Sequence, residues 1–190
     1  LETLNTTTLE LPYQVAILRG RSFYLSGNYS EAIPALQLFV EAPEDLDILP
    51  VNRHSALTTL SDALLQPGDP KAALETYRSA QSSDFAQSED FPPRARITST
   101  VAGARIASAA NEKGFALRLL NEALEEAVSS YPDTWLEGQL HAEKIDILDS
   151  MGDHEGAYLA ATRASEIGCS VNGTGVLLRL LGSLKSDPGL

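Results

Sequence analysis

One local pattern occurs four times in this chain: a Gly or Asn, a few polar residues, and then an alanine that opens an apolar helical run. The four copies end at Ala32, Ala73, Ala116 and Ala157, so their alanines are 41, 43 and 41 residues apart. A period of this length is typical of helical hairpins that stack in line, each contacting only its neighbours. We therefore predict an all-α repeat array.

Turn residues and the helical spacing of apolar residues divide the chain into four helical pairs. They predict a repeat domain over residues 12–170, with units at about 12–45, 52–83, 94–130 and 134–168. Residues 1–11 are interpreted as an N-terminal segment, the end of a preceding unit. Residues 171–190 are interpreted as a capping helix and tail, or as the first half of a truncated fifth unit.

Individual residues predict local features of these units. Ser30, Asp69 and Asp153 are expected to be N-caps, because a short polar side chain can accept a hydrogen bond from an unpaired amide of the first turn. Residues 82–93 are expected to form a surface loop, with Phe85 and Phe91 packed against the array. Tyr131 and Trp135, at the start of the fourth unit, are expected to pack in the core or between helices.

Composition narrows the classes of partner. The chain has 26 acidic and 14 basic residues among 190, which gives a net charge of −12. This charge disfavours nucleic acid and anionic membranes. It either favours a basic or neutral protein partner or serves only to keep the chain in solution. The single cysteine, Cys169, excludes an internal disulfide and fits a reducing, cytoplasmic setting. We find no apolar run of the roughly 20 residues that a membrane helix needs.

The units resemble tetratricopeptide repeats. That family has a small residue, a glycine and an alanine at its eighth, fifteenth and twentieth positions. The residues at these positions in unit order are Gly20, Gly27 and Ala32; Ser61, Gly68 and Ala73; Ala104, Asn111 and Ala116; and Ile145, Gly152 and Ala157. The chain departs from the family in its period, which exceeds the usual 34 residues, and in the third unit, which has Asn111 and Gly103 where glycine and leucine are typical.

This resemblance implies a right-handed α-solenoid of about four hairpins plus a short C-terminal helix. The longer period resembles that of kinesin light chains and of the sensor regions of some bacterial transcription activators.

The resemblance also implies a binding face, because the first helix of each pair lines the concave side of such arrays. The residues expected to bind a peptide there are Gln14, Arg21, Tyr24, Asp62, Arg105, Asp146 and Asp149. At the ninth position of the units the charge alternates in sign. Two interpretations are open: these charges hold an extended peptide, or neighbours pair with each other and contribute about 0–1 kcal/mol. The Lys and Asn clamp with which some family members hold a terminal carboxylate is absent.

Residues for catalysis are sparse. His54, His141 and His154 fall in different units, without a nucleophile motif or a metal-ligand spacing around them. We predict no enzymatic activity, no metal and no cofactor.

Two functions follow as hypotheses. In the first, the chain is an interaction scaffold or adaptor that binds a peptide or helix of a partner protein in its concave groove. In the second, it is a regulatory or sensor domain of a larger transcription activator or signalling ATPase. The apolar segment 176–184 offers a further surface for self-association through the C-terminal helix.

Overall fold

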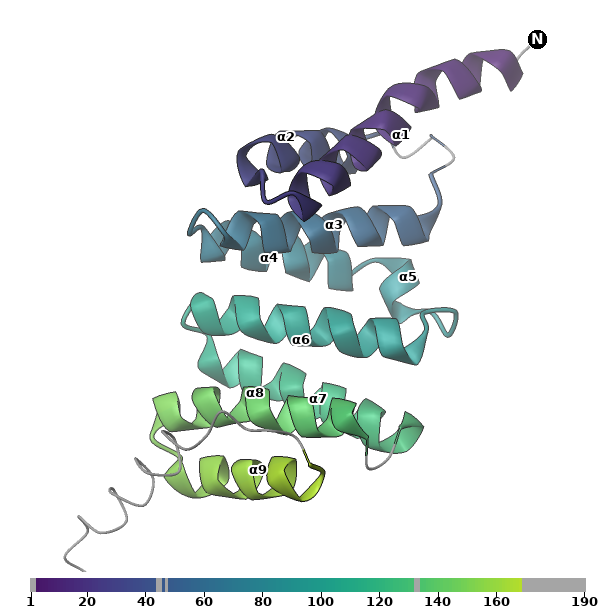
Figure 1. Ribbon diagram of the computed structural model, residues 1–190. Helices are drawn as coiled ribbons and strands as arrows, with labels where there is room; N and C mark the ends of the chain where they lie inside the picture. Colours follow the sequence, from purple (N-terminus) through teal and green to yellow (C-terminus); the bar gives the residue numbers. More distant parts are fainter. Residues whose placement is uncertain (1–2, 44–45, 47, 132–133, 169–190) are drawn as a thin grey trace, which may run out of the picture. The chain divides into compact units, whose positions relative to one another are not determined.

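The computed structural model describes residues 3–43, 46, 48–131 and 134–168, with side chains from residue 12 onward except that of Asp84 (Figure 1). All regular elements in these ranges are α-helices. They are α1 (Thr3–Leu25), α2 (Tyr29–Val40), α3 (Pro50–Leu65), α4 (Pro70–Gln81), α5 (Asp84–Gln87), α6 (Pro93–Ala109), α7 (Lys113–Ser130), α8 (Trp135–Met151) and α9 (His154–Glu166). The predicted capping helix at 171–190, with its apolar segment, lies outside the described residues.

The helices belong to two compact units, unit 1 (Leu1–Pro92) with α1–α5 and unit 2 (Pro93–Leu190) with α6–α9. Unit 1 contains the hairpins α1/α2 and α3/α4, and unit 2 contains α6/α7 and α8/α9 (Figure 1). Within each unit the second helix of one hairpin packs on the first helix of the next, α2 on α3 and α7 on α8. None of the helices in the described ranges combines the length and apolar character that a membrane span requires.

Each hairpin turn contains one residue in the left-handed backbone conformation. The φ angle is 77° at Gly27, 89° at Gly68, 81° at Gly152 and 63° at Asn111. Asparagine tolerates this conformation better than most residues with a side chain, so Asn111 replaces the expected glycine without changing the turn. In all four turns this residue and the next donate their amides to carbonyls three and five residues earlier. In the third turn, Asn111 N donates to Ser108 O at 3.0 Å and Glu112 N to Ala107 O at 2.8 Å.

The repeated alanine follows directly from this turn. In each hairpin its amide donates to the carbonyl of the residue after the left-handed one, as Ala157 N does to Asp153 O at 3.0 Å. All four repeat alanines are fully buried, with 0% exposure. Ala157 packs in a core cluster with Ile145 and Leu148 of α8. The small side chain therefore lies where the two helices of a pair meet, as predicted.

On the opposite helix of the first hairpin, Gly20 likewise allows the two helices to pack closely. A β-carbon at this position would lie 2.7 Å from Cγ of Leu36, a side chain with 0% exposure on α2. Such a separation is far shorter than a van der Waals contact, so only glycine allows α1 and α2 to approach this closely.

The N-cap predictions are confirmed at two positions. Oδ1 of Asp69 accepts from Ala72 N at 3.1 Å, and Oδ1 of Asp153 accepts from Gly156 N at 2.9 Å. The prediction is wrong for Ser30, because α2 begins one residue before it, at Tyr29. The carbonyl of Asn28, directly after the left-handed Gly27, accepts from the amides of Glu31 and Ala32 at 3.2 and 3.0 Å. The helix therefore begins from the turn itself, without a side-chain cap.

The segment after α4 is only partly a loop, because α5 forms one helical turn within it. Oγ of Ser83 accepts from Ala86 N at 3.3 Å and caps this turn. Phe91 is 4% exposed, and its ring centroid lies 4.8 Å from that of His54 and 5.2 Å from that of Phe85. The prediction that the two phenylalanines pack against the array is confirmed, and His54 of α3 is the residue that receives them.

The hairpin turns generate the first testable prediction. Gly152→Ala should lower the free energy of unfolding by about 1–2 kcal/mol, because alanine disfavours the left-handed conformation. Gly114→Ala is the matched control: this glycine lies in helix α7 with open space around its missing β-carbon, and the substitution should stabilise the protein by about 0.5 kcal/mol. Asn111→Gly should preserve stability or raise it slightly. Urea unfolding of the full chain measures all three, and equal losses for the two alanine variants would contradict this account of the turn.

His54 generates a second prediction, on pH. Its Nδ1 donates to Ala80 O at 3.1 Å, while Nε2 is buried without a hydrogen-bond partner among the described residues. Burial lowers the pKa of His54, and the hydrogen bond to Ala80 opposes this only in part. The unfolded chain therefore takes up a proton below about pH 6.5 that the folded chain resists, and stability falls as the pH falls.

We expect the free energy of unfolding to decrease by up to about 2 kcal/mol between about pH 8 and about pH 5 through this residue. A His54→Leu variant should lose that part of the pH dependence. His154→Gln, at an exposed position of α9, serves as the control and should keep it. Chemical denaturation across this pH range decides the matter, and identical pH profiles for the wild type and His54→Leu would refute the prediction.

Candidate functional site

The residues predicted to bind a peptide fall into two groups, one in each unit. Gln14, Arg21 and Tyr24 lie on α1 and Asp62 on α3, all in unit 1. The other three lie in unit 2, Arg105 on α6 and Asp146 and Asp149 on α8. Each group therefore spans the first helices of two consecutive hairpins.

In unit 1 the polar side chains of this face bind one another. Nη2 of Arg21 donates to Oγ of Ser55, and the Tyr24 hydroxyl donates to the carboxylate of Asp62, so both bonds join α1 to α3. Burial, then the hydrogen bond and the negative charge of Asp62, raise the pKa of Tyr24 to about 12. Tyr24 therefore stays protonated and remains a donor over the whole physiological range. Gln14 is exposed.

The alternating charges do not pair in the way that one interpretation expected. Arg21 and Asp62 form no ion pair with each other in the described part of the chain, because each binds a neutral side chain. In unit 2, Arg105 binds Glu143 with two nitrogens, and its Nε lies 3.2 Å from Oε2. Glu143 lies one helical turn before Asp146, so the cation of α6 meets an acid of α8 that the repeat register did not single out.

The exposed side of α8 extends one turn further toward the N-terminus of the helix than the sequence predicted. Trp135 was expected to pack, but its side chain is 66% exposed, and Tyr131 is 36% exposed. Trp135 lies four residues before Gln139, and the spacing of four and three continues through Ala142, Asp146 and Asp149. These five residues therefore share one side of the helix. We call these residues, together with Arg105, the α6/α8 face.

The core lies on the other side of α8. Leu140, Ile145, Ile147 and Leu148 are buried there, and this leaves Trp135 on the outward side. The signal that could have identified Trp135 was the same spacing, continued one turn toward the N-terminus of the helix.

An ion pair with a buried carboxylate fixes the start of α8. Glu137, two residues after Trp135, is 3% exposed, and its Oε1 accepts from Nε and Nη2 of Arg163 on α9 at 3.0 and 2.9 Å. His141 lies 3.9 Å from the same oxygen. Burial, followed by the charge of Lys144, lowers the pKa of His141. Because a buried carboxylate is costly without its partner, this pair holds the first turn of α8, and with it Trp135, in place.

The acidic end of the stripe is partly paired. Oδ1 of Asp149 lies 3.1 Å from Nδ1 of His154, which is exposed, whereas Asp146 is exposed and has no ion pair in the described ranges. The α6/α8 face thus presents an indole at one end and carboxylates at the other, with the Arg105 fork beside them. Such a surface suits recognition of a polypeptide with basic groups.

No three or more His, Cys, Asp and Glu side chains among the described residues are grouped so that they could hold a metal ion. His54 is enclosed by phenylalanines in unit 1, while His141 and His154 make the contacts with acids given above.

Comparisons with known proteins bear on the fold. No family model and no curated protein matches the chain. Among solved structures, the chain is similar to the MamA protein, with 18% identity, a TM-score of 0.59, and coverage of 92% of this chain and 88% of that one. It is also similar to Bacillus thuringiensis PlcR, solved in complex with the peptide PapR7 and DNA, with 14% identity and a TM-score of 0.61.

The match to PlcR covers 93% of this chain but only 59% of the PlcR chain. At these identities the likenesses establish the fold. They confirm the predicted all-α helical-repeat architecture of the tetratricopeptide type.

Proposed function

We propose that the chain is a protein-interaction scaffold that binds a peptide or helix of a partner protein on the faces formed by the first helices of its hairpins. The repeat fold supports this function, because stacked hairpins leave one side of each first helix open to a ligand. The α6/α8 face of unit 2 is the proposed main site. Gln14, Arg21, Tyr24 and Asp62 of unit 1 are proposed as additional contacts.

The observation that carries the proposal is the exposure of Trp135. A tryptophan that is 66% exposed leaves a large apolar surface in water, and burying it against a partner would be favourable. Tryptophan is also among the residues most enriched at the energetic centres of protein interfaces. The Glu137–Arg163 pair already holds the start of α8, where Trp135 lies. The helix therefore loses little conformational entropy when a partner binds.

The charges of the face select the kind of partner. Asp146 is exposed, and the whole chain carries a net charge of −12, so a basic or neutral segment is attracted and an acidic one repelled. Arg105 adds a local exception. Its exposed fork could exchange Glu143 for a carboxylate of the ligand.

A second candidate function is a regulatory or sensor domain within a larger transcription activator or signalling ATPase. The likeness to PlcR favours it, since that protein was solved with a bound peptide and DNA and the matched region is only part of it. In this case the same faces would bind a small effector peptide or a neighbouring domain. A conformational change on binding would then be transmitted to another part of the longer protein.

A selection of random linear peptides on the full chain tests the proposed site. We expect the enriched peptides to be basic or neutral, and Trp135→Ala to weaken their binding about 30-fold, as loss of a hot-spot residue does. Asp146→Lys should weaken basic peptides selectively and should do so less at high salt.

Tyr158→Ala is the matched control, because Tyr158 is an aromatic residue of α9, 43% exposed, outside the α6/α8 face. It should leave the affinity unchanged. Fluorescence anisotropy with the enriched peptides gives the dissociation constants. Peptides that bind the Trp135→Ala and Asp146→Lys variants as tightly as the wild type would show that the site lies elsewhere.

A further inference from the structure

The exposed stripe of α8 has a counterpart on α6, the first helix of the preceding hairpin. Arg94 of α6 and Trp135 of α8 each lie 17 residues before the left-handed residue of their turn, so they occupy the same position in their repeats. The two helices run in the same direction in Figure 1, and Arg105 of α6 reaches Glu143 of α8. Arg94 therefore extends the α6/α8 face at the end where Trp135 lies.

This repeat position is exposed in earlier hairpins as well. Val51 of α3, which lies 17 residues before Gly68, is 43% exposed. Arg94 is exposed although the hairpin α8/α9 follows it in the same unit. The exposure of Trp135 is therefore a property of the repeat, and not a consequence of its place in the last described hairpin.

The end of the face at Trp135 is cationic. Arg94 is exposed, and none of the described carboxylates forms an ion pair with it. Glu137, the acid of α8 nearest to Trp135 in sequence, is 3% exposed and is bound by Arg163. It therefore does not neutralise the surface around Arg94.

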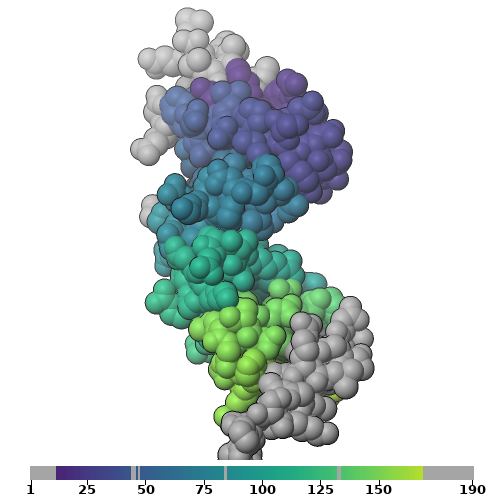
Figure 2. Space-filling view, turned by 90° about the vertical axis from the view of Figure 1, so that its left-hand side faces the viewer, coloured from purple at the N-terminus to yellow at the C-terminus, as the bar shows by residue number. Residues whose placement is uncertain are grey.

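The other end of the face is acidic. Asp146 is exposed, and Asp149, which contacts His154, follows it by one turn of α8. Arg105 occupies the Asp146 position of α6, but Glu143 already binds it, so the charge of Asp146 stays uncompensated. This end lies toward the hairpin turns of unit 2, on the side that faces the viewer in Figure 2. The α6/α8 face thus has a dipolar charge distribution along the helices.

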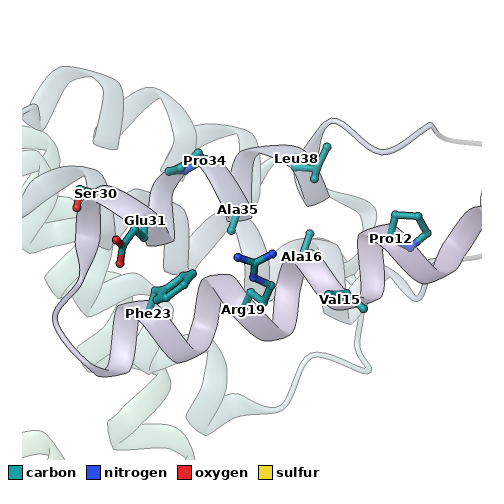
Figure 3. Close-up of a pocket in the computed structure, with 10 residues that line it drawn as sticks. All are labelled: Pro12, Val15, Ala16, Arg19, Phe23, Ser30, Glu31, Pro34, Ala35 and Leu38. Carbon is teal, nitrogen blue, oxygen red and sulfur yellow. The ribbon is translucent and has the colours of Figure 1, made fainter.

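Unit 1 does not repeat this combination among its described residues. Its α3 has Val51 at the Trp135 position, and Asp62, at the Asp146 position, accepts a hydrogen bond from Tyr24. Unit 1 has instead an open cavity of about 520 Å³ between α1 and α2, which is lined by residues at other repeat positions (Figure 3). The combination of an arginine, an indole and distant carboxylates therefore points to unit 2.

The side chains between the two ends favour an extended ligand. Among the described residues of α6 and α8, the exposed large apolar side chains are Trp135 and Met151, and Met151 lies off the stripe. A helix with an apolar stripe would therefore bury only one large side chain of this face. An extended chain has unpaired backbone amides and carbonyls, and the exposed carboxamide of Gln139 can both donate to them and accept from them.

We propose that the α6/α8 face binds an extended, dipolar segment of a partner protein, with an Asp or Glu at Arg94, an apolar side chain on Trp135 and a Lys or Arg at Asp146. This inference rests on the proposed function and specifies its ligand. Asp146 lies about 16 Å beyond Trp135 at 1.5 Å per residue of helix. An extended chain covers this distance in about five residues, so the basic residue follows the apolar one at that spacing. The acidic residue lies close to the apolar one, away from the basic one.

The residues of this chain that follow α9 carry their charges in a different order. The contact of α9 with Glu137 shows that α9 ends beside the start of α8, so a segment that leaves α9 begins at the Arg94 end of the face. The first charges along it are Arg179 and Lys185, and its acid, Asp187, comes last. A segment of another protein with an acid before its cations is the better match in charge.

A library of peptides with one fixed leucine and all other positions varied tests the proposal. Selection on the full chain should enrich Asp or Glu within about three residues on one side of the leucine, and Lys or Arg about five residues away on the other side. A basic preference about 11 residues away would indicate a helical ligand and would overturn the proposal.

Charge reversal on the face should change these preferences one at a time. Arg94→Glu should turn the acidic preference into a basic one and leave the dependence on Trp135 intact. Asp146→Lys should turn the basic preference into an acidic one. Arg118→Glu is the matched control, because Arg118 is exposed on α7, outside the face, and its substitution should change neither preference. Circular dichroism checks that each variant keeps the helix content of the wild type.

A double-mutant cycle measures the contact at Arg94 directly. Replacing the acidic residue of an enriched peptide by alanine should weaken binding to the wild type about tenfold, and should have no further effect on Arg94→Gln. Peptides that require Trp135 but show no acidic preference, or that keep this preference on Arg94→Glu, would overturn the inference and leave the proposed function standing. Binding that is insensitive to both Trp135→Ala and Asp146→Lys would instead overturn the proposed function.

Two other occupants of the face give distinct results. If the chain's own C-terminal residues covered it, Arg179→Glu together with Lys185→Glu would strengthen peptide binding. If a second copy covered it, sedimentation velocity would show self-association that Trp135→Ala abolishes. We expect neither effect, and either one would overturn the proposal.

Discussion

The left-handed residue at each hairpin turn is the constraint on which the rest of the structure depends. It closes the first helix of a pair, because its own amide and the next one return to the last turn of that helix. The carbonyl of the following residue then starts the second helix. That carbonyl accepts a hydrogen bond from the amide four residues later, which belongs to the repeat alanine. The turn therefore determines which residue of the second helix lies against the first helix. A bulky side chain there would force the helices apart, which explains why four alanines with 0% exposure recur with the turns.

The same geometry decides which residues are left for binding. Once the turn has set the rotation of a hairpin, one side of its first helix faces the second helix and another faces the preceding hairpin. On α8 these sides are occupied by Leu140, Ile145 and Leu148, and the side that carries Trp135 and Asp146 remains outside. Recognition residues therefore need no dedicated loop in this fold. They occupy a stripe that the packing leaves open, and neighbouring ion pairs such as Glu137–Arg163 hold it in place.

The sequence predicted the features that are encoded locally. Turn glycines, Asp69, Asp153 and the repeat alanines identify the hairpins because each acts through the backbone within five residues. It predicted less well where the result depends on a neighbouring helix. Trp135 was expected to pack because aromatic residues usually do, but the core of unit 2 lies on another side of α8. The partners of Arg21, Asp62 and Arg105 were also missed, because long side chains choose among several acceptors within reach on the next helix.

Arg19 of α1, Leu60 of α3 and Lys144 of α8 occupy the same position in their repeats. This position shows how strongly the surroundings of a residue decide its role. Leu60 contributes to the core of unit 1 at 4% exposure, and Lys144, half-buried, forms a hydrogen bond to a neutral amide. Burial lowers the pKa of Lys144, so covering this cation has an electrostatic cost. Arginine keeps its charge under conditions where lysine loses it, and it is better suited to a carboxylate than to a neutral amide. The same place in the repeat thus changes from core to polar contact to exposed cation as the helix that covers it changes. An array built by repetition can thereby vary its recognition without altering its fold.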